Sequence, residues 1–315
     1  MMKHNRPWSR YAVRLYCLIR YGRAGGHAEE WWPDLRLSLV KGREGRGEAL
    51  TDEQLRAAVP SIFATEAHES RSERFAVVPT ITVLEGLRSE GFEPFSAVQA
   101  RSRIAGKAEY TKHMLRLRHR SITNTEGEAF EIVLVNANDG TSAYQMIPGF
   151  FRFVCANGLM TGETFSEVKV RHSGNAIGEV IEGAYRVLED APQVVEQVSR
   201  FKSITLQDAE REILAEAAHA LRFPAAAEER AKAAPISPDA LLRPRRTSDR
   251  ATDLWTAFNV VQENTLKGGL RGRVVDANGR IARRTTREVA GIDQNRALNR
   301  ALWMLTERMA ELKAA

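Results

Sequence analysis

Arginine and lysine side chains are concentrated in two stretches of this sequence, and guanidinium and ammonium groups in such numbers are suited to binding phosphate. Residues 101–120 hold seven Lys or Arg against one acid, and residues 236–300 hold thirteen against seven. Residues 174–230 hold eleven acids against six bases. A chain polarised in this way can build a positive surface although its net charge is only +6. A positive surface attracts polyanions, nucleic acid foremost.

The first basic stretch contains a segment with alternating side chains. Arg116, Arg118 and Arg120 alternate with leucine and histidine, so a strand would place three guanidiniums on one face, about 7 Å apart. Such a row can follow the backbone of a single-stranded nucleic acid without reading its bases. The alternative is the solvated outer face of a half-buried sheet. A second alternating segment, residues 165–172, carries Lys169 and Arg171, so one sheet can hold two basic strands.

The second basic stretch combines arginine with glycine in the segment 267–287. Glycine gives the backbone freedom, and guanidiniums can bind phosphate oxygens through two parallel hydrogen bonds. We interpret this segment as a basic loop that closes over a nucleic acid strand, and the alternative is a mobile solubilising loop. The predicted nucleic-acid-binding residues are Lys112, Arg116, Arg118, Arg120, Lys169, Arg171, Lys267, Arg271, Arg273, Arg280, Arg283, Arg284 and Arg287.

No motif for catalysis, metal or a cofactor is found in the sequence. Neither a P-loop nor a GxGxxG segment is present, and no serine lies in a GxSxG elbow. The four histidines that lie near acidic residues have neither HxxxH nor HxH spacing, and we interpret them as structural; they are His68, His113, His119 and His172. We therefore expect no catalytic residues, no metal and no cofactor. A hydrolase or nuclease would need carboxylates or histidines that converge in space.

Composition indicates a protein of the cytoplasm. The only cysteines, Cys17 and Cys155, lie far apart, which is typical of a reducing compartment. No run of about 18 apolar residues exists, so we expect no membrane span. Residues 1–47 hold ten bases and four acids, and arginines interrupt any signal-peptide core. We interpret them as a poorly ordered basic extension, which an unused upstream start codon would explain.

Periodicity predicts an α+β fold with an antiparallel β-meander packed against long α-helices. Thr51 to Gln54 form a capping box, and we expect Thr80 to cap a second helix that Gly91 closes. Strands are expected at 75–79, 114–120, 130–135 and 141–155, with turns at 124–128 and 138–140. We expect the strand at 141–155 to break at Pro148-Gly149.

Helical periodicity dominates from Ala176 onwards. One long helix is expected to kink near Pro192, and another to begin near Thr205. A helical C-terminal region stops at Gly268-Gly269 and restarts at Asp293. The expected domains are the 1–47 extension, an α+β core at 48–223, an Ala/Pro/Arg-rich linker at 224–248 and a helical region with the basic loop at 249–315.

Several segments resemble a bacterial family borne by plasmids and phages. They are HESRSERFAVVPT (68–80), TKHMLRLRH (111–119), NDGTSAYQMIPGFFRFVCANGLM (138–160), VRHSG (170–174) and DLWTAFNVVQEN followed by KGGLRGR (253–273). The family is catalogued as a domain of unknown function, number nine hundred thirty-two. The resemblance runs from about Leu50 to the C-terminus. It implies a mobile-element context, and the family has no established catalytic residues to transfer.

Charge and resemblance together predict a DNA-binding accessory protein of a plasmid or phage. Its most concrete form is a single-stranded DNA binding or annealing protein that assists recombination or plasmid establishment; annealing rests on analogy alone. The alternative is a protein-interaction module that counters a host defence system, with the acidic helices of 174–230 as its partner surface. DNA, single-stranded before double-stranded, is the expected partner; a homo-oligomer and a host protein partner stay open.

Overall fold

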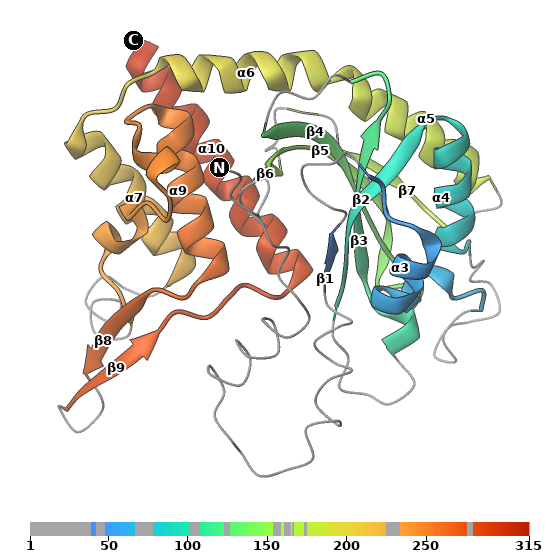
Figure 1. The fold of residues 1–315 in the computed structure, drawn as a ribbon, viewed down its shortest axis with the longest axis horizontal. Helices are drawn as coiled ribbons and strands as arrows, with labels where there is room; N and C mark the ends of the chain where they lie inside the picture. The colour runs from blue at the N-terminus through green and yellow to red at the C-terminus, as the bar shows by residue number, and fades with distance from the viewer. Residues whose placement is uncertain are drawn as a thin grey trace, which may run out of the picture. The chain divides into compact units, whose positions relative to one another are not determined.

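The computed structural model describes residues 39–41, 48–66, 78–100, 108–122, 127–153, 159–160, 165, 167–172, 175–224, 234–275 and 280–314 (Figure 1). The chain divides into two units, Met1–Arg36 and Leu37–Ala315, and every described residue belongs to the second. Apart from the backbone of residues 39–41, the predicted N-terminal extension lies outside the described residues.

An antiparallel seven-stranded sheet forms the first half of the fold and confirms the predicted meander. Its strand order is β1-β2-β3-β4-β5-β6, and β7 also pairs with β5. The strands are β1 (Leu39–Lys41), β2 (Phe92–Gln99), β3 (His113–His119), β4 (Glu128–Ala137), β5 (Ser142–Arg152), β6 (Leu159–Met160) and β7 (Val168–Val170).

Among the described residues, five α-helices precede the C-terminal region. The capping box is confirmed, because Thr51 Oγ1 accepts from the Gln54 amide while the Gln54 side chain accepts from the Thr51 amide. The break near Pro192 is also confirmed, since one helix ends at Glu189 and the next begins at Ala191. These helices are α3 (Asp52–Ala58), α4 (Thr80–Ser89), α5 (Ala176–Glu189), α6 (Ala191–Ser203) and α7 (Asp208–Arg222).

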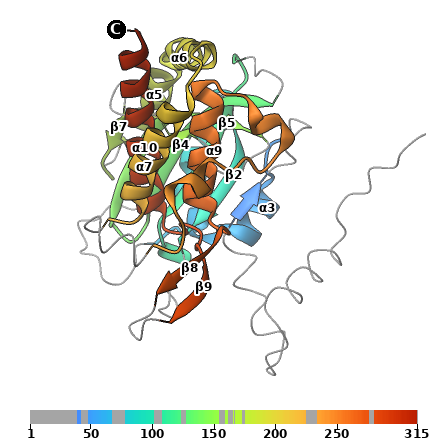
Figure 2. The same cartoon turned by 90° about the vertical axis from the view of Figure 1, so that its left-hand side faces the viewer.

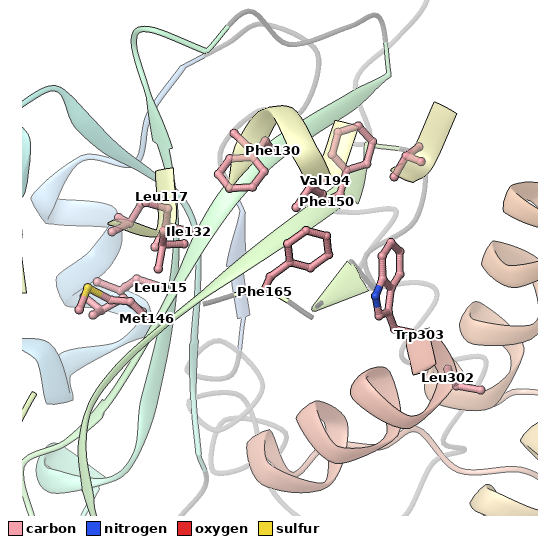
Figure 3. Close-up of a cluster of buried hydrophobic side chains, with 14 of the residues drawn as sticks. Leu115, Leu117, Phe130, Ile132, Met146, Phe150, Phe165, Val194, Leu302 and Trp303 are labelled. Atoms are coloured by element: carbon pink, nitrogen blue, oxygen red, sulfur yellow. The ribbon is translucent and has the colours of Figure 1, made fainter. Parts of the chain in front are cut away.

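The strand register separates the sheet into two faces. Leu115 pairs with Leu134, which pairs with Met146, so these side chains share one face. They are fully or almost fully buried and belong to the main core together with residues of α4 and α5. Leu115 and Met146 are labelled in the close-up of this core (Figure 3). The same core continues to Trp303, whose ring centroid lies 5.0 Å from that of Phe201. One continuous apolar cluster therefore joins the sheet to the C-terminal helices.

The C-terminal region contains helices α9 (Leu254–Lys267) and α10 (Ile292–Ala314). Asp253 caps α9 by accepting a hydrogen bond from the Thr256 amide at 2.8 Å. The predicted stop is confirmed, because Gly268 ends α9 at φ 63° and Gly269 follows at φ 81°. Between the two helices the chain forms a separate two-stranded sheet of β8 (Arg271–Val275) and β9 (Ile281–Thr285).

Four local predictions are wrong. The basic segment after Gly269 is a hairpin and not a loop. Strand β5 continues through Pro148-Gly149, because β4 pairs along its whole length whereas β7 and β6 pair only with 144–146 and 149–150, respectively. Helix α4 begins at Thr80 after Pro79, so Thr80 is not a cap. Helix α10 begins at Ile292, one residue early.

Two other predictions fall largely outside the described residues. Of the expected strand at 75–79, the structure describes only residues 78–79; of the expected turn at 124–128, only 127–128.

Most of the predicted linker is described. Residues 234–248 include the 3₁₀ helix Pro238–Leu242 and the start of a second, Thr247–Arg250. Leu241 is fully buried in the main core. This part of the linker is therefore packed against the helices.

Candidate nucleic-acid interface

The arginines of β3 lie on the sheet face opposite Leu115 and converge on one carboxylate. Arg118 Nε donates to Glu131 Oε1 at 2.7 Å, and Arg116 Nε donates to Glu131 Oε2. The Glu131 side chain is fully buried, and the Arg116 and Arg118 side chains are 6% and 10% exposed. The single carboxylate neutralises half of the positive charge and satisfies a donor of each guanidinium.

Aromatic rings cover the same two guanidiniums. The Arg116 guanidinium carbon lies 3.5 Å from the ring centroid of Phe151, and that of Arg118 lies 4.0 Å from the centroid of Phe95. Cation–π contacts of this kind are favourable when the cation is shielded from water. The prediction that Arg116 and Arg118 line an open face is therefore wrong, because carboxylate and rings occupy the space a phosphate would need.

The other basic residues of the sheet are not gathered into a row. Lys112 Nζ lies 2.7 Å from the Asp293 carboxylate at the start of α10. Lys169 is exposed and lies 3.4 Å from Glu167. Arg120 and Arg171 are exposed. Arg120 follows the end of β3 and Arg171 the end of β7, two strands with β4 and β5 between them. The expected basic face of the sheet is thus divided into separate, mostly neutralised positions.

Hairpin β8–β9 places its arginines differently. Arg273 is directly opposite Arg283 in the register, and Arg271 is opposite Thr285. Because side chains alternate along a strand, Arg271, Arg273 and Arg283 project from one face of the hairpin. All three are exposed. We refer to these three residues as the arginine face.

The opposite face of the hairpin is fixed to the body of the protein. Gly272 lies against residues 235–236, and an added Cβ there would collide with the Pro235 carbonyl oxygen. At the base, the Gly269 amide donates to Thr286 O at 2.8 Å and the Thr286 amide donates to Leu270 O at 2.9 Å. The hairpin is therefore anchored at Gly272 and at its base, while in Figures 1 and 2 it extends away from the main sheet.

Among the described residues, no carboxylate balances the charge of the hairpin. Arg284 and Arg287 are also exposed. Within the part of the chain that the structure describes, no carboxylate lies within ion-pair distance of the arginine face, Arg284 or Arg287. Arg280 is exposed as well and has a contact of its own. Lys267, at the end of α9, lies 3.3 Å from Glu263. The structure thus brings the predicted C-terminal arginines together and separates them from those of the sheet.

The sequence interpretation missed three features of these regions. It did not identify Glu131 as the partner of Arg116 and Arg118, because strand register cannot be read from periodicity. It also missed the hairpin, for which a signal existed: Asn278-Gly279 lies between two segments of alternating residues, a pattern typical of a β-hairpin. Exposed Ile281 within β9 was likewise not singled out.

The histidines of the sheet form a buried polar network. Ser61 Oγ lies 2.9 Å from His113 Nδ1, and Thr80 Oγ1 lies 2.8 Å from His113 Nε2. Asn136 Nδ2 donates to Thr80 Oγ1 at 3.0 Å. Burial lowers the pKa of His113 to about 4, so its imidazole is neutral at pH 7. Although Ser61 and His113 resemble a nucleophile and its base, both are sealed in the interior, which agrees with a structural role.

The described residues show neither a metal-binding cluster nor a membrane-spanning helix. They contain no group of three or more His, Cys, Asp or Glu side chains placed to hold a metal ion. His68 lies outside them, whereas His119 and His172 are partly buried and bonded to neighbouring groups. Among the same residues, no helix combines the length and apolar character that a membrane span requires.

Comparison with known proteins identifies one family. The family described as Domain of unknown function (DUF932) matches residues 67–303. Two proteins of Escherichia coli strain K12 are similar to the chain. The UPF0380 protein YafZ is 47% identical over 264 residues, and the UPF0380 protein YfjQ is 46% identical over 264 residues. Each alignment covers 84% of this chain and 93% of the relative. No solved structure matches.

Proposed function

The chain belongs to the DUF932 family, and from the placement of its arginines we propose that it is a DNA-binding accessory protein that contacts DNA through hairpin β8–β9. The observation that carries the proposal is the arginine face, because Arg271, Arg273 and Arg283 are exposed, project on one side and have no carboxylate partner among the described residues. Phosphate oxygens bind well to exposed guanidiniums that have no carboxylate partner.

The energetics of the hairpin support a ligand of negative charge. Like charges directly opposite on paired strands destabilise the pair. Arg273 and Arg283 nevertheless occupy opposite positions, and a threonine or a glutamate at either position would stabilise an isolated hairpin better. A bound polyanion offsets this repulsion, because each guanidinium then faces a phosphate, and counterions are released from the DNA.

The proposal moves the DNA contact away from the sheet. A row of arginines on β3 was the reason to expect a single strand, and Arg116 and Arg118 are buried against Glu131. DNA binding in recombination or plasmid establishment remains part of the proposal, resting on charge and on the family resemblance. The annealing activity has no residue-level support beyond that analogy.

Fluorescence anisotropy with labelled DNA at about 50 mM and about 200 mM salt tests the proposal. We expect the full chain to bind and to weaken steeply with salt. The Arg273→Ala/Arg283→Ala variant should lose affinity at both salt concentrations and reduce the slope of log affinity against log salt by about two.

The matched control removes two exposed arginines from other parts of the surface. Arg186 and Arg308 are 61% and 76% exposed, and each pairs with a glutamate on its own helix. Arg186→Ala/Arg308→Ala changes net charge as much as the hairpin variant and should leave the slope nearly unchanged. Absence of binding by the full chain at low salt, or equal losses in the two double variants, would overturn the proposal.

A protein-interaction module that counters a host defence system is the second candidate. Apolar side chains exposed on the acidic helices favour it. Val195 on α6 is 40% exposed, and Ile213 on α7 is 56% exposed beside Glu212 and Glu216. An apolar position within an acidic surface suits a basic protein partner. A host protein that the wild type retains and the Ile213→Asp variant loses, with DNA affinity unchanged, would support this candidate.

A further inference from the structure

We propose that hairpin β8–β9 enters the minor groove of double-stranded DNA and inserts Ile281 between base pairs, so that the duplex bends on binding. This inference rests on the proposed function and names the form of DNA that the same site takes. Its starting point is Ile281, an apolar side chain that is 68% exposed although it lies within a strand.

The register places Ile281 on the arginine face. Ile281 is paired with Val275, two positions along from the Arg273 and Arg283 pair, and two positions along a strand is the same side. The exposed face therefore reads, from base to far end, Arg271, the Arg273 and Arg283 pair, and then Ile281. Ile281 is thus farther from the base of the hairpin than the paired guanidiniums. In a DNA groove the bases lie between two phosphate backbones, so Ile281 can reach the bases while the two arginines contact the backbones.

Exposure of Ile281 has no structural use within the described residues. Scattered exposed apolar residues are normal on protein surfaces, but the neighbours of Ile281 in β9 restrict what can cover it. Arg280, Arg283 and Arg284 surround it in the sequence and are exposed. A ligand that buries Ile281 must therefore combine negative charge with an apolar interior. Duplex DNA has both, and apolar wedges of this kind unstack a base step and bend DNA toward the major groove.

The composition of the hairpin favours a duplex over a single strand. Proteins that bind single-stranded DNA usually stack its bases on aromatic side chains. Residues 268–290 contain no Phe, Tyr or Trp. Arginine, by contrast, is attracted to the minor groove, where the negative potential is strong. The hairpin thus has the side chains for a groove and lacks those for a stacking platform.

The decisive experiment compares three probes with the full-length protein: a duplex labelled with a donor and an acceptor dye at its two ends, the single strand of the same sequence, and an RNA duplex. We expect the wild type to prefer the DNA duplex and to raise energy transfer between its ends, because bending shortens the distance. The A-form minor groove of RNA is wide and shallow, so the RNA duplex should bind more weakly and should not bend.

Ile281→Thr is the matched variant, since threonine keeps the β-branched shape but removes the wedge. We expect it to bind the duplex about tenfold more weakly and to leave energy transfer near that of free DNA. The salt slope should stay as in the wild type, because the arginines are intact. Ile213→Thr, an exposed isoleucine on α7, is the control and should bend DNA like the wild type.

The outcomes separate the two claims. If the wild type binds none of the probes, the proposed function fails. If it binds, but prefers the single strand, or bends the duplex equally well with Ile281→Thr, only the wedge is overturned. Loss of bending in Ile281→Thr with an unchanged salt slope supports both the hairpin contact and the insertion of Ile281.

Discussion

Strand β3 and hairpin β8–β9 are both rich in arginine, but the arginines differ in burial and in their ion pairs. On β3, Arg116 and Arg118 are buried, share the carboxylate of Glu131 and lie against phenylalanine rings. On the hairpin, Arg273 and Arg283 face each other across two strands, exposed. A row of arginines in a sequence therefore does not indicate a binding surface until the positions of the carboxylates are known.

Removing the charge of Glu131 should have the largest effect, which is a loss of stability. Glu131→Gln leaves two buried guanidiniums without a counter-charge, and removing one partner from a buried ion pair costs about 3–5 kcal/mol in the free energy of unfolding. Urea unfolding measures this cost. Glu93→Gln, whose carboxylate is 45% exposed and 3.5 Å from Arg88, is the control and should cost at most about 1 kcal/mol. A loss below about 1 kcal/mol for Glu131→Gln would contradict the structural role.

Lowering the pH should reduce the stability of the protein without changing the salt dependence of DNA binding. Burial lowers the pKa of His113 from 6.5 to about 4. Between these values the unfolded chain binds a proton that the folded protein excludes, so the free energy of unfolding should fall as pH falls, by about 3 kcal/mol over the whole window. The arginines stay charged throughout, so the salt slope of DNA binding should not change while the protein remains folded.

Unfolding curves between pH 7 and pH 4.5 provide this measurement. The His113→Gln variant keeps a neutral polar side chain at all pH values and should lose most of the pH dependence. His172, whose pKa is also lowered by burial, contributes a smaller share in the same direction. If His113→Gln and the wild type lose stability in parallel, another group is responsible.

The smallest effect tests the repulsion within the hairpin. Arg273→Thr removes one of two like charges that lie directly opposite, and we expect the hairpin to become more stable by about 0.2–1 kcal/mol while DNA affinity falls. Amide hydrogen exchange of β8 and β9 is the suitable measurement, since a hairpin can open locally. Arg284→Thr is the control because Arg284 is opposite Gly272. Slower exchange in both variants would mean that the cross-strand pair is not the cause.

The periodic parts of the fold could be predicted from the sequence. Alternation identified β3, and the Pro192 break separated α5 from α6, because both signals are local. Pro148 misled the prediction for β5. A proline is tolerated where one side of a strand has no partner, and among the described residues neither β6 nor β7 pairs with Pro148. The local sequence does not say which strand lies alongside.

The candidate site was harder to predict than the fold. Arg116 and Arg118 have the two-residue spacing that places both side chains on one face of a strand. Their burial, however, depends on Glu131, which lies on the next strand in the sheet. For the hairpin, the sequence located the arginine-rich segment but did not predict the two strands that carry it, and a role of these arginines in binding stays a prediction. Asn278-Gly279 was the local signal for it, whereas the placement of Ile281 beside the arginines requires the register.

Gly272 determines the direction in which the hairpin points. Because this residue has no side chain, β8 can rest directly on the backbone at Pro235, and any larger residue would lever the two strands away from that support. The orientation of the arginines is accordingly a property of the surrounding helical region as much as of the hairpin sequence. A peptide with the sequence of residues 268–287, or the same segment grafted onto another protein, would carry the same charges but would not hold the arginines in this orientation.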